Sequence, residues 1–285
     1  MAGILYVVAT PIGNLEDVTL RALRILREVS LIAAEDTRRT ARLLQHYSIS
    51  TRTTSLHEHN EREKTPQLLD RLRAGDSIAL VSDAGTPLIS DPGQTLVGAA
   101  RAAGIRVESI PGPSAVMAAL SSSGLETAEF VFLGFPPTRS KDRKHWLSDL
   151  SAQTRLAVFF EAPHRIRRTL SDLGDALGFD RQIAVGRELT KAYEELVVWP
   201  IVQHLEHFTA PKGEFTILVP PAVIEVDESQ SLPSAVELRA ELGRITNNKP
   251  TTRRQALKVL AERHGIAVNL LYKLLDDGQD GGHTP

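Results

Sequence analysis

Short apolar runs alternate with amphipathic stretches along residues 1–125. The run ILYVVA at 4–9 is apolar throughout, which is typical of a strand buried on both faces of a parallel sheet. The stretch at 18–29 carries one apolar stripe at helical spacing, and Asp17 or Thr19 can cap its start. The alternation continues with strands predicted at 31–36, 77–83 and 105–112 and helices at 37–47, 61–75, 94–104 and 113–124. Such alternation across short connections predicts βαβ units around a mostly parallel sheet.

The order of the elements changes in residues 126–222. Strands are predicted at 130–135, 155–163, 183–189, 195–201 and 214–220, with a helix at 164–177. Some of these strands follow one another without a helical pattern between them, which favours a mixed sheet. We therefore expect two α/β domains, an N-terminal one at 1–125 built on a mostly parallel sheet and a second at 126–222 built on a mixed sheet.

The C-terminal part of the chain has a different character. The segment 223–233 contains proline, serine and acidic residues and is predicted to be a linker. Residues 234–277 carry three short helical patterns, and the last two, joined across Gly265, resemble a helix-turn-helix. The tail at 278–285 is predicted to be disordered.

The charge of the chain is unevenly distributed. Residues 231–275 hold eight Lys and Arg against three Glu, a net charge of +5. Because the whole chain has a net charge of −2, the rest of it carries −7. A small basic helical domain thus follows an acidic body.

The composition narrows the class of protein. The 285 residues are 42% hydrophobic and 24% charged, the usual proportions of a globular protein. No apolar run approaches the ~20 residues that a membrane-spanning helix needs, and the N-terminus shows no basic leader, so we predict neither a membrane span nor a signal peptide. The absence of cysteine excludes disulfides and thiolate metal sites and fits a cytoplasmic protein.

Four short loops that follow predicted strands are rich in glycine and proline. They are ATPIGN at 9–14, SDAGTP at 82–87, IPGPSA at 110–115 and FEAPHR at 160–165. Ligands of open parallel sheets bind beyond the carboxyl ends of the strands, and we expect all four loops to share one rim there. Glycine lets the backbone approach a ligand and proline stiffens a loop, although tight turns also use both residues for geometry alone. Because four such loops occur together, we predict a small molecule held largely by main-chain groups.

Several familiar motifs are absent from the sequence. There is no G-x-G-x-x-G and no G-x-x-x-x-G-K-[ST], which disfavours a Rossmann dinucleotide site and a P-loop. The motif HEHNE at 57–61 offers two imidazoles at a spacing that only weakly indicates a metal site. We therefore predict no metal ligands and interpret HEHNE as a polar surface or as a loop that contacts substrate.

The four loops belong to a longer ordered set of motifs. The set lies between residues 3 and 219. In chain order its motifs are VVATPIGNLEDVTLRAL, AAEDTR, HEHNE, VSDAGTPLISDPG, IPGPSA, FLGFPP, FFEAPHR, GRELTKAYEE and KGEFTILV. Together they resemble the tetrapyrrole-methylase (class III) fold of S-adenosylmethionine-dependent methyltransferases. Within that superfamily the set, with its basic C-terminal extension, is most similar to the bacterial family that methylates the 2'-oxygen of cytidine 1402 in 16S ribosomal RNA.

This resemblance implies that S-adenosylmethionine binds in a cleft between the two α/β domains. Carried over motif by motif, the cofactor-binding residues are Ile12, Asp83, Gly85, Thr86, Ser114, Ala115, Ala162, Pro163 and Gly213. Asp83 is expected to accept a hydrogen bond from the cofactor's amino group, while the adenine lies against apolar and backbone atoms. A homodimer is expected from the same resemblance, with apolar helix faces such as VMAAL available for the contact.

The implied reaction is an in-line transfer of a methyl group to a ribose hydroxyl. Alignment supplies much of the catalysis, and a general base adds about 10²–10⁴-fold. We favour Glu161 and His57 as catalytic residues for this role. The other candidates are Glu35, Asp36, Glu188 and His164. Each carboxylate can instead pair with a neighbouring arginine and steady its loop, so the identity of the base stays open.

Basic clusters supply the expected contacts to RNA. They comprise Arg38 and Arg39, then Arg139, Lys141, Arg143 and Lys144, then Arg165, and in the C-terminal domain Arg253 and Arg254. A single cluster is more often a solvated helix face, but several on an acidic body favour a phosphate track for 16S ribosomal RNA in the small subunit.

Two other functions fit parts of the sequence. A methyltransferase of the same superfamily that acts on a corrin-type tetrapyrrole would share the cofactor loops, but it would need neither the basic clusters nor the helical tail. A DNA-binding regulator would use the helix-turn-helix pattern and sense a metabolite with the α/β body, but the richest motifs lie in that body.

Overall fold

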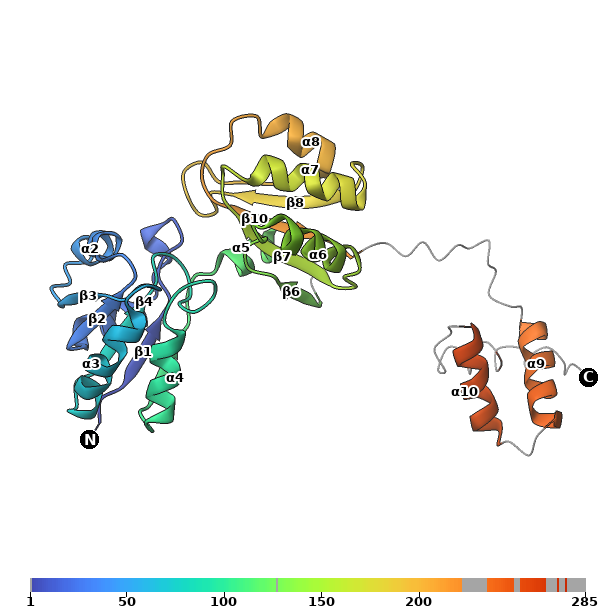
Figure 1. The fold of residues 1–285 in the computed structure, drawn as a ribbon, viewed down its shortest axis with the longest axis horizontal. Helices are drawn as coiled ribbons and strands as arrows, with labels where there is room; N and C mark the ends of the chain where they lie inside the picture. The colour runs from blue at the N-terminus through green and yellow to red at the C-terminus, as the bar shows by residue number, and fades with distance from the viewer. Residues whose placement is uncertain are drawn as a thin grey trace, which may run out of the picture. The chain divides into compact units, whose positions relative to one another are not determined.

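The computed structural model describes residues 2–126, 128–221, 235–248 and 252–264, together with Leu271 and Leu275. The chain divides into two compact units, Met1–Ala222 and Val223–Pro285 (Figure 1). The predicted linker at 223–233 and the predicted tail at 278–285 lie outside the described residues.

A five-stranded parallel sheet with the order β3-β2-β4-β1-β5 forms the first domain of Met1–Ala222. Its strands are β1 (Leu5–Val8), β2 (Leu31–Ala34), β3 (Thr53–Ser55), β4 (Ile78–Val81) and β5 (Val107–Ile110). β2 and β4 are buried along their whole length, whereas β1, for which burial on both faces was predicted, is half-buried at Tyr6 and Val7. β3 was not predicted, because its sequence Thr-Thr-Ser carries no apolar pattern, and it forms an edge of the sheet.

Helices cover both faces of this sheet and make a three-layer domain (Figure 1). They are α1 (Leu20–Glu28), α2 (Thr37–His46), α3 (Glu61–Arg73) and α4 (Gln94–Ala102), with a short 3-10 turn, η1 (Leu15–Asp17), before α1. α1 and α2 share one hydrophobic core with the sheet, and α3 and α4 share the other. Thr19 caps α1 by accepting a hydrogen bond from the Ala22 N–H at 3.1 Å.

The second domain is a mixed sheet with the order β6-β7-β10-β8-β9. Its strands are β6 (Phe130–Phe132), β7 (Leu156–Glu161), β8 (Gln182–Arg187), β9 (Glu195–Pro200) and β10 (Phe215–Val219). β6 runs parallel to β7, whereas β10 is antiparallel to both β7 and β8, and β9 is antiparallel to β8. The expected pair of domains, one on a parallel and one on a mixed sheet, is confirmed.

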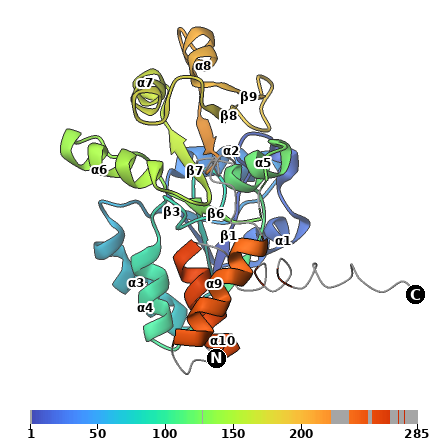
Figure 2. The same ribbon diagram turned by 90° about the vertical axis from the view of Figure 1, so that its right-hand side faces the viewer.

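One face of the second sheet is covered by three helices, α6 (Ser140–Ser151), α7 (Ile166–Leu177) and α8 (Ile201–His207) (Figure 2). The other face receives α5 (Ala115–Ser122), whose Val116 and Leu120 share a core with Val158 and Leu218. Because α5 directly follows β5, it connects the two sheets by packing on the second. α6 was not predicted, because the charges in SKDRKHWLSDLS obscure its apolar period.

The C-terminal unit contains two described helices, α9 (Ala235–Asn248) and α10 (Arg253–His264). Leu238 of α9 and Leu257 of α10 share a core with Leu271 and Leu275. The rest of the third predicted helix, at 266–277, lies outside the described residues. In the part of the chain that the structure describes, no helix is long and apolar enough to cross a membrane.

A buried carboxylate ties α3 to the start of α4. Gly93 precedes α4 and has no side chain with which to cap it. Glu61 is only 7% exposed, and its Oε1 accepts hydrogen bonds from the N–H groups of Thr95 at 2.7 Å and Leu96 at 3.1 Å. This carboxylate therefore caps α4 from another helix and faces the positive end of its dipole. The second glutamate of HEHNE thus has a structural role.

We predict that Glu61→Ala lowers the free energy of unfolding by about 1–3 kcal/mol, because two N–H groups at the start of α4, one of them on the buried Leu96, lose their acceptor. Urea denaturation followed by circular dichroism measures the loss. Glu63→Ala, an exposed change in the same turn of α3, is the control and should stay within about 0.5 kcal/mol of the parent protein. Equal losses for the two variants would contradict the capping role.

Candidate active site

Three loops at the carboxyl edge of the first sheet are fastened to one another by hydrogen bonds. Thr10, after β1, and Gly85, after β4, exchange both backbone N–H···O=C bonds at 2.9 Å. The Thr86 hydroxyl donates to the carbonyl of Pro113, after β5, at 3.5 Å. Gly85 has a φ of +81°, which residues with a side chain rarely adopt. The close pairing of these two loops therefore requires glycine at this position.

The fourth loop, at 160–165, follows β7 and therefore belongs to the second sheet. The prediction that all four loops share one rim is wrong for this loop, because β7 pairs with β6 and β10 instead of with a strand of the first domain. The loop instead lines, together with the other three, a cavity of about 390 Å³ between the two domains, which we call the cleft cavity.

The cleft cavity collects eight of the nine residues expected to bind a cofactor. They are Ile12, Asp83, Gly85, Thr86, Ser114, Ala115, Ala162 and Pro163. It also collects residues that were not predicted, among them Ala84, Ile89, Ser90, Asp91, Val116, Phe135, Phe160, Phe215 and Thr216. Most of these lie within or beside the same motifs, so the motifs indicate where the cavity is but not its complete lining.

Gly213, the ninth residue, is not among those that line the cleft cavity, although Glu214 is. Its φ is +93°, and a Cβ atom placed on it would lie 2.4 Å from the Cγ atom of Glu188. The carboxylate of Glu188 accepts hydrogen bonds from the Glu214 N–H at 3.0 Å and from Lys191 Nζ at 2.7 Å. Glycine at this position therefore makes room for a side chain that fixes the neighbouring wall.

Three carboxylates, those of Glu35, Asp83 and Asp91, lie among the lining residues that the first domain provides. Asp83 Oδ1 accepts a hydrogen bond from the Asp36 N–H at 2.9 Å, and the Asp83 N–H donates to Glu35 Oε2 at 3.2 Å. Arg39 is the cationic side chain among the lining residues, and its Nε lies 3.5 Å from Asp83 Oδ2. One arginine thus faces several acids.

Burial and crowding change how these acids titrate. Burial raises the pKa of Asp91 to about 6, and the negative charges of Glu35 and Asp83 act in the same direction. Burial is also the main reason why the pKa of Glu35 lies above its ordinary value. A cavity with this excess of acidic groups suits a ligand that carries positive charge.

Glu161 lines the cleft cavity, but protein donors engage both of its oxygens. The residue is 2% exposed. Oε1 accepts from the Ala162 N–H at 2.8 Å and lies 3.2 Å from Arg165 Nε, while Oε2 accepts from the Thr169 hydroxyl at 2.5 Å. A general base needs a lone pair that faces its substrate, so these contacts favour a role for Glu161 in fixing the loop at 160–165.

His57 lies elsewhere in the first domain. It follows the edge strand β3 and is not among the residues that line the cleft cavity. Its backbone N–H donates to Asn60 Oδ1 at 2.9 Å, and its Nε2 lies 3.1 Å from Asn60 Nδ2. Its Nδ1 is buried and has no hydrogen-bond partner among the described residues. The structure therefore does not bring His57 and Glu161 into one site.

Several of the cations predicted to bind RNA are exposed. Arg139, Lys141 and Lys144 are exposed at the start of α6, and Arg38 and Arg39 are exposed at the start of α2. Arg38 also pairs with Asp36 across 2.8 Å. Arg253 and Arg254 begin α10, but their side chains lie outside what the structure describes.

The prediction that Arg143 contacts RNA is wrong. Arg143 is 4% exposed, because α6 turns it toward α7. Its Nε donates to Asp172 Oδ2 at 2.5 Å, and its Nη2 donates to the Thr169 hydroxyl at 2.8 Å. Arg165 is also largely enclosed, because its side chain is 21% exposed and pairs with Glu161. Both guanidinium groups therefore form ion pairs within the second domain.

A second hollow of about 320 Å³ adjoins the cleft cavity and shares Ile12, Arg39 and Asp83 with it. It adds two further cations, Arg42 and Lys191, of which Lys191 is paired with Glu188 at 2.7 Å and Glu214 at 3.1 Å. The cleft cavity is thus acidic, whereas its neighbour brings basic side chains within reach of the same rim. A positively charged cofactor and a phosphate-bearing substrate are the ligands that such a pair of hollows suits.

Comparisons with known proteins agree with this site. Residues 4–203 match the family model of the Tetrapyrrole (Corrin/Porphyrin) Methylases. The chain is 47% identical over 276 residues to ribosomal RNA small subunit methyltransferase I of Vibrio cholerae serotype O1, which covers 95% of this chain and 94% of that protein. It is 48% identical over 274 residues to the protein of the same name from Synechocystis sp., with 95% and 97% covered.

Solved structures share the fold at lower identity. A diphthine synthase superposes with a TM-score of 0.63 at 15% identity, over 77% of this chain and 90% of that one. A uroporphyrin-III C-methyltransferase from Thermus thermophilus, solved with S-adenosyl homocysteine, gives a TM-score of 0.56 at 18% identity, over 76% and 97%. By its motifs, its fold and its relatives at more than 40% identity, this chain belongs to the tetrapyrrole methylase family and, within it, to the ribosomal RNA small subunit methyltransferases I.

Proposed function

We propose that this protein transfers a methyl group from S-adenosylmethionine to 16S ribosomal RNA of the small subunit. The cleft cavity carries the proposal, because eight residues expected from the cofactor motifs converge there from both domains. The names of relatives that cover 95% of the chain supply the substrate class. The motif resemblance supplies the finer assignment, which is the 2'-oxygen of cytidine 1402. Because that substrate is part of the ribosome, the proposal also places the protein in the cytoplasm.

The cleft cavity suits S-adenosylmethionine in size and charge. Its volume of about 390 Å³ lies within the about 300–1,000 Å³ of small-molecule sites. The carboxylates of Glu35, Asp83 and Asp91 favour a ligand that carries a sulfonium and an ammonium group. Ile12 and Pro163 offer apolar surface to the adenine from opposite domains. Bound there, the cofactor supplies an activated methyl group.

The protein's own contribution is to align the two reactants and to take up a proton. The tied loops of the first domain and the Glu161 contacts of the second hold the cavity walls in place. A ribose hydroxyl must lose its proton during or after attack. We propose Asp91 as a better candidate than Glu161, whose oxygens are both engaged, or His57, which does not line the cavity. Asp91 lines the cleft cavity, and its raised pKa of about 6 suits a proton acceptor near neutral pH.

The exposed cations support binding of RNA beside this cavity. Arg139, Lys141 and Lys144, at the start of α6, and Arg39, on α2, come from different domains. Phosphate contacts of this kind position a strand without reading its sequence. We propose that they hold the strand while the target ribose enters between the domains.

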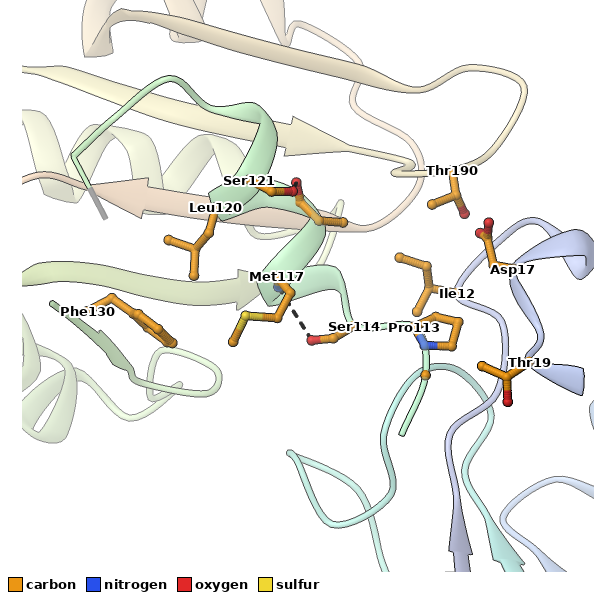
Figure 3. A pocket seen from close by; sticks show the side chains of 12 residues that line it. Ile12, Asp17, Thr19, Pro113, Ser114, Met117, Leu120, Ser121, Phe130 and Thr190 are labelled. Carbon is orange, nitrogen blue, oxygen red and sulfur yellow. Dashed lines mark hydrogen bonds between the residues drawn. The ribbon is translucent and has the colours of Figure 1, made fainter. Parts of the chain in front are cut away.

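We also propose that the protein is a homodimer that associates through α5. Met117 on this helix is 52% exposed and lines a hollow of about 640 Å³, together with Leu120 and Phe130 (Figure 3). Exposed apolar surface of this kind often marks an interface. Light scattering should report the mass of a dimer for the parent protein. Met117→Lys should weaken the dimer. Val202→Lys, a change at an exposed position on α8, is the control and should leave the dimer intact. A monomeric parent protein would contradict this proposal.

Methyl transfer to small ribosomal subunits tests the proposed function. Subunits that lack the modification should gain a 2'-O-methyl group on a cytidine of 16S RNA when incubated with the protein and S-adenosylmethionine, as mapped by mass spectrometry of RNA fragments. A variant with alanine at Arg139, Lys141 and Lys144 should require a higher subunit concentration, because it loses phosphate contacts. Alanine at Arg62, Arg73 and Arg101, exposed on α3 and α4, is the matched control.

Two results would count against the proposed function. One is the absence of any methyl group on the RNA. The other is transfer to a corrin-type tetrapyrrole but not to subunits.

Cofactor affinity should depend on pH through Asp91. The carboxyl is mostly protonated below its pKa of about 6 and ionised above it, so affinity for a cationic ligand should rise with pH. We predict that affinity for S-adenosylmethionine, measured by calorimetry, is about tenfold higher at pH 7.5 than at pH 5. The reason is that about a tenth of the Asp91 carboxyl is ionised at pH 5 and nearly all of it at pH 7.5. Asp91→Asn should show a flatter profile. Parallel profiles for the two proteins would remove Asp91 from this role.

A further inference from the structure

Phe135 is a large apolar side chain in an unusual place. It is 49% exposed, yet it lines the cleft cavity from the loop between β6 and α6. Ile89, from the loop after β4, is 48% exposed and lines the same cavity from the first domain. A Cβ atom placed on Gly134 would lie 3.5 Å from Ser90 Oγ, so the two loops approach each other closely. Each domain therefore presents one uncovered apolar side chain at this rim.

The ring of Phe135 is held in position by its neighbours. Its centroid lies 5.6 Å from that of Phe160, which in turn packs 4.9 Å from Phe132. The Gly134 carbonyl accepts a hydrogen bond from the Phe160 N–H at 2.8 Å, and Gly134 has a φ of +66°. The backbone that precedes Phe135 is thereby pinned to β7, and the ring rests on an aromatic row.

Two arginines pin the backbone that follows Phe135. Arg165 Nη2 donates to the Pro136 carbonyl, and Arg143 Nη1 donates to the Pro137 carbonyl at 3.4 Å. Arg143 is itself fixed by Asp172 at 2.5 Å. The two prolines reduce the freedom of this loop further. Arg143 and Arg165, both expected to touch RNA, thus act on the loop that carries Phe135.

A rigid, half-exposed ring at the mouth of a cavity is suited to stack on another flat ring. The exposed cations Arg139, Lys141 and Lys144 follow it at the end of the same loop and in the first two turns of α6. An aromatic platform beside a basic track is the arrangement that holds single-stranded nucleic acid, because bases stack on the ring while phosphates meet the cations. A base must leave its neighbours for its ribose to enter a cavity, and a platform offsets the lost stacking.

We propose that Phe135 is the stacking platform for a nucleobase of the substrate RNA at the target position, with Arg143 and Arg165 as positioning residues. The inference rests on the proposed function, since it needs RNA as the substrate. It assigns a substrate-binding contact to a residue that is not among the nine expected to bind the cofactor.

The test separates binding of RNA from binding of cofactor. Phe135→Ala should raise the small-subunit concentration that gives half-maximal methyl transfer by about 5- to 150-fold, the equivalent of the about 1–3 kcal/mol that base stacking contributes. Its affinity for S-adenosylmethionine by calorimetry should change less than about twofold. Phe135→Trp should restore most of the loss, whereas Phe135→Leu should not. Phe179→Ala, at a phenylalanine that is 41% exposed on the same domain, is the control.

The positioning role has its own readout. Arg143→Lys keeps the charge but cannot reproduce all three guanidinium contacts, so it should raise the half-maximal subunit concentration in the same way. In the Phe135→Ala background the same change should add little, because the ring that it positions is gone. Fully additive effects would show that Arg143 acts independently of Phe135.

Two outcomes would overturn the inference. If Phe135→Ala weakens S-adenosylmethionine binding as strongly as it weakens subunit binding, the ring contacts the cofactor instead of the RNA. If neither changes while the parent protein methylates subunits, the ring has no part in recognition. A parent protein without activity on subunits is a separate result, because it counts against the proposed function itself.

Discussion

The paired backbone hydrogen bonds between Thr10 and Gly85 are the contact on which the candidate site depends. β1 and β4 are neighbours in the first sheet, so their loops leave the same edge, and the pair of bonds ties the loops together. The positive φ of Gly85 makes this crossing possible. Once the loops are tied, Ile12 and Asp83 line the same cavity. The position of the site therefore follows from parallel strand order and one glycine.

The second domain uses charge mainly to fix geometry. Two buried or half-buried ion pairs form there, Glu161 with Arg165 and Arg143 with Asp172. Their remaining hydrogen bonds go to Thr169, to the Ala162 N–H and to proline carbonyls. Buried ion pairs contribute little net stability, because desolvation offsets their attraction, but breaking one is costly. They are therefore well suited to hold a loop in one conformation. The acids of the first domain differ, because Asp91 and Glu35 have raised pKa values and face the cavity.

The sequence predicts those parts of the fold that local pattern determines. β2 and β4 were predicted as strands of the alternating pattern, and both are buried along their whole length. β3, α6 and α8 were missed, since three polar residues, a charge-rich helix and a seven-residue helix carry no clear period. Resemblance to a family located eight lining residues of the cavity. It could not show that Gly213 makes room for the Glu188 side chain instead of lining the cleft cavity, because that depends on where Glu188 packs.

Tertiary packing also decided the roles of individual charged residues. Arg139 and Arg143 lie one turn apart in the same basic run, yet one is exposed and the other is 4% exposed against Asp172. The run itself does not distinguish them, because the partners of Arg143, Asp172 and Thr169, lie on α7. His57 and Glu161 were both favoured as candidate bases because their side chains can accept a proton. The structure places them in different domains.

A crystal structure of the protein with S-adenosylhomocysteine tests the central claim most directly. The account predicts density for the ligand between the two domains, with its amino group near Asp83 and its backbone contacts at Gly85 and Ala162. Density at another place on the protein, or a cleft closed by side chains in the complex, would contradict it.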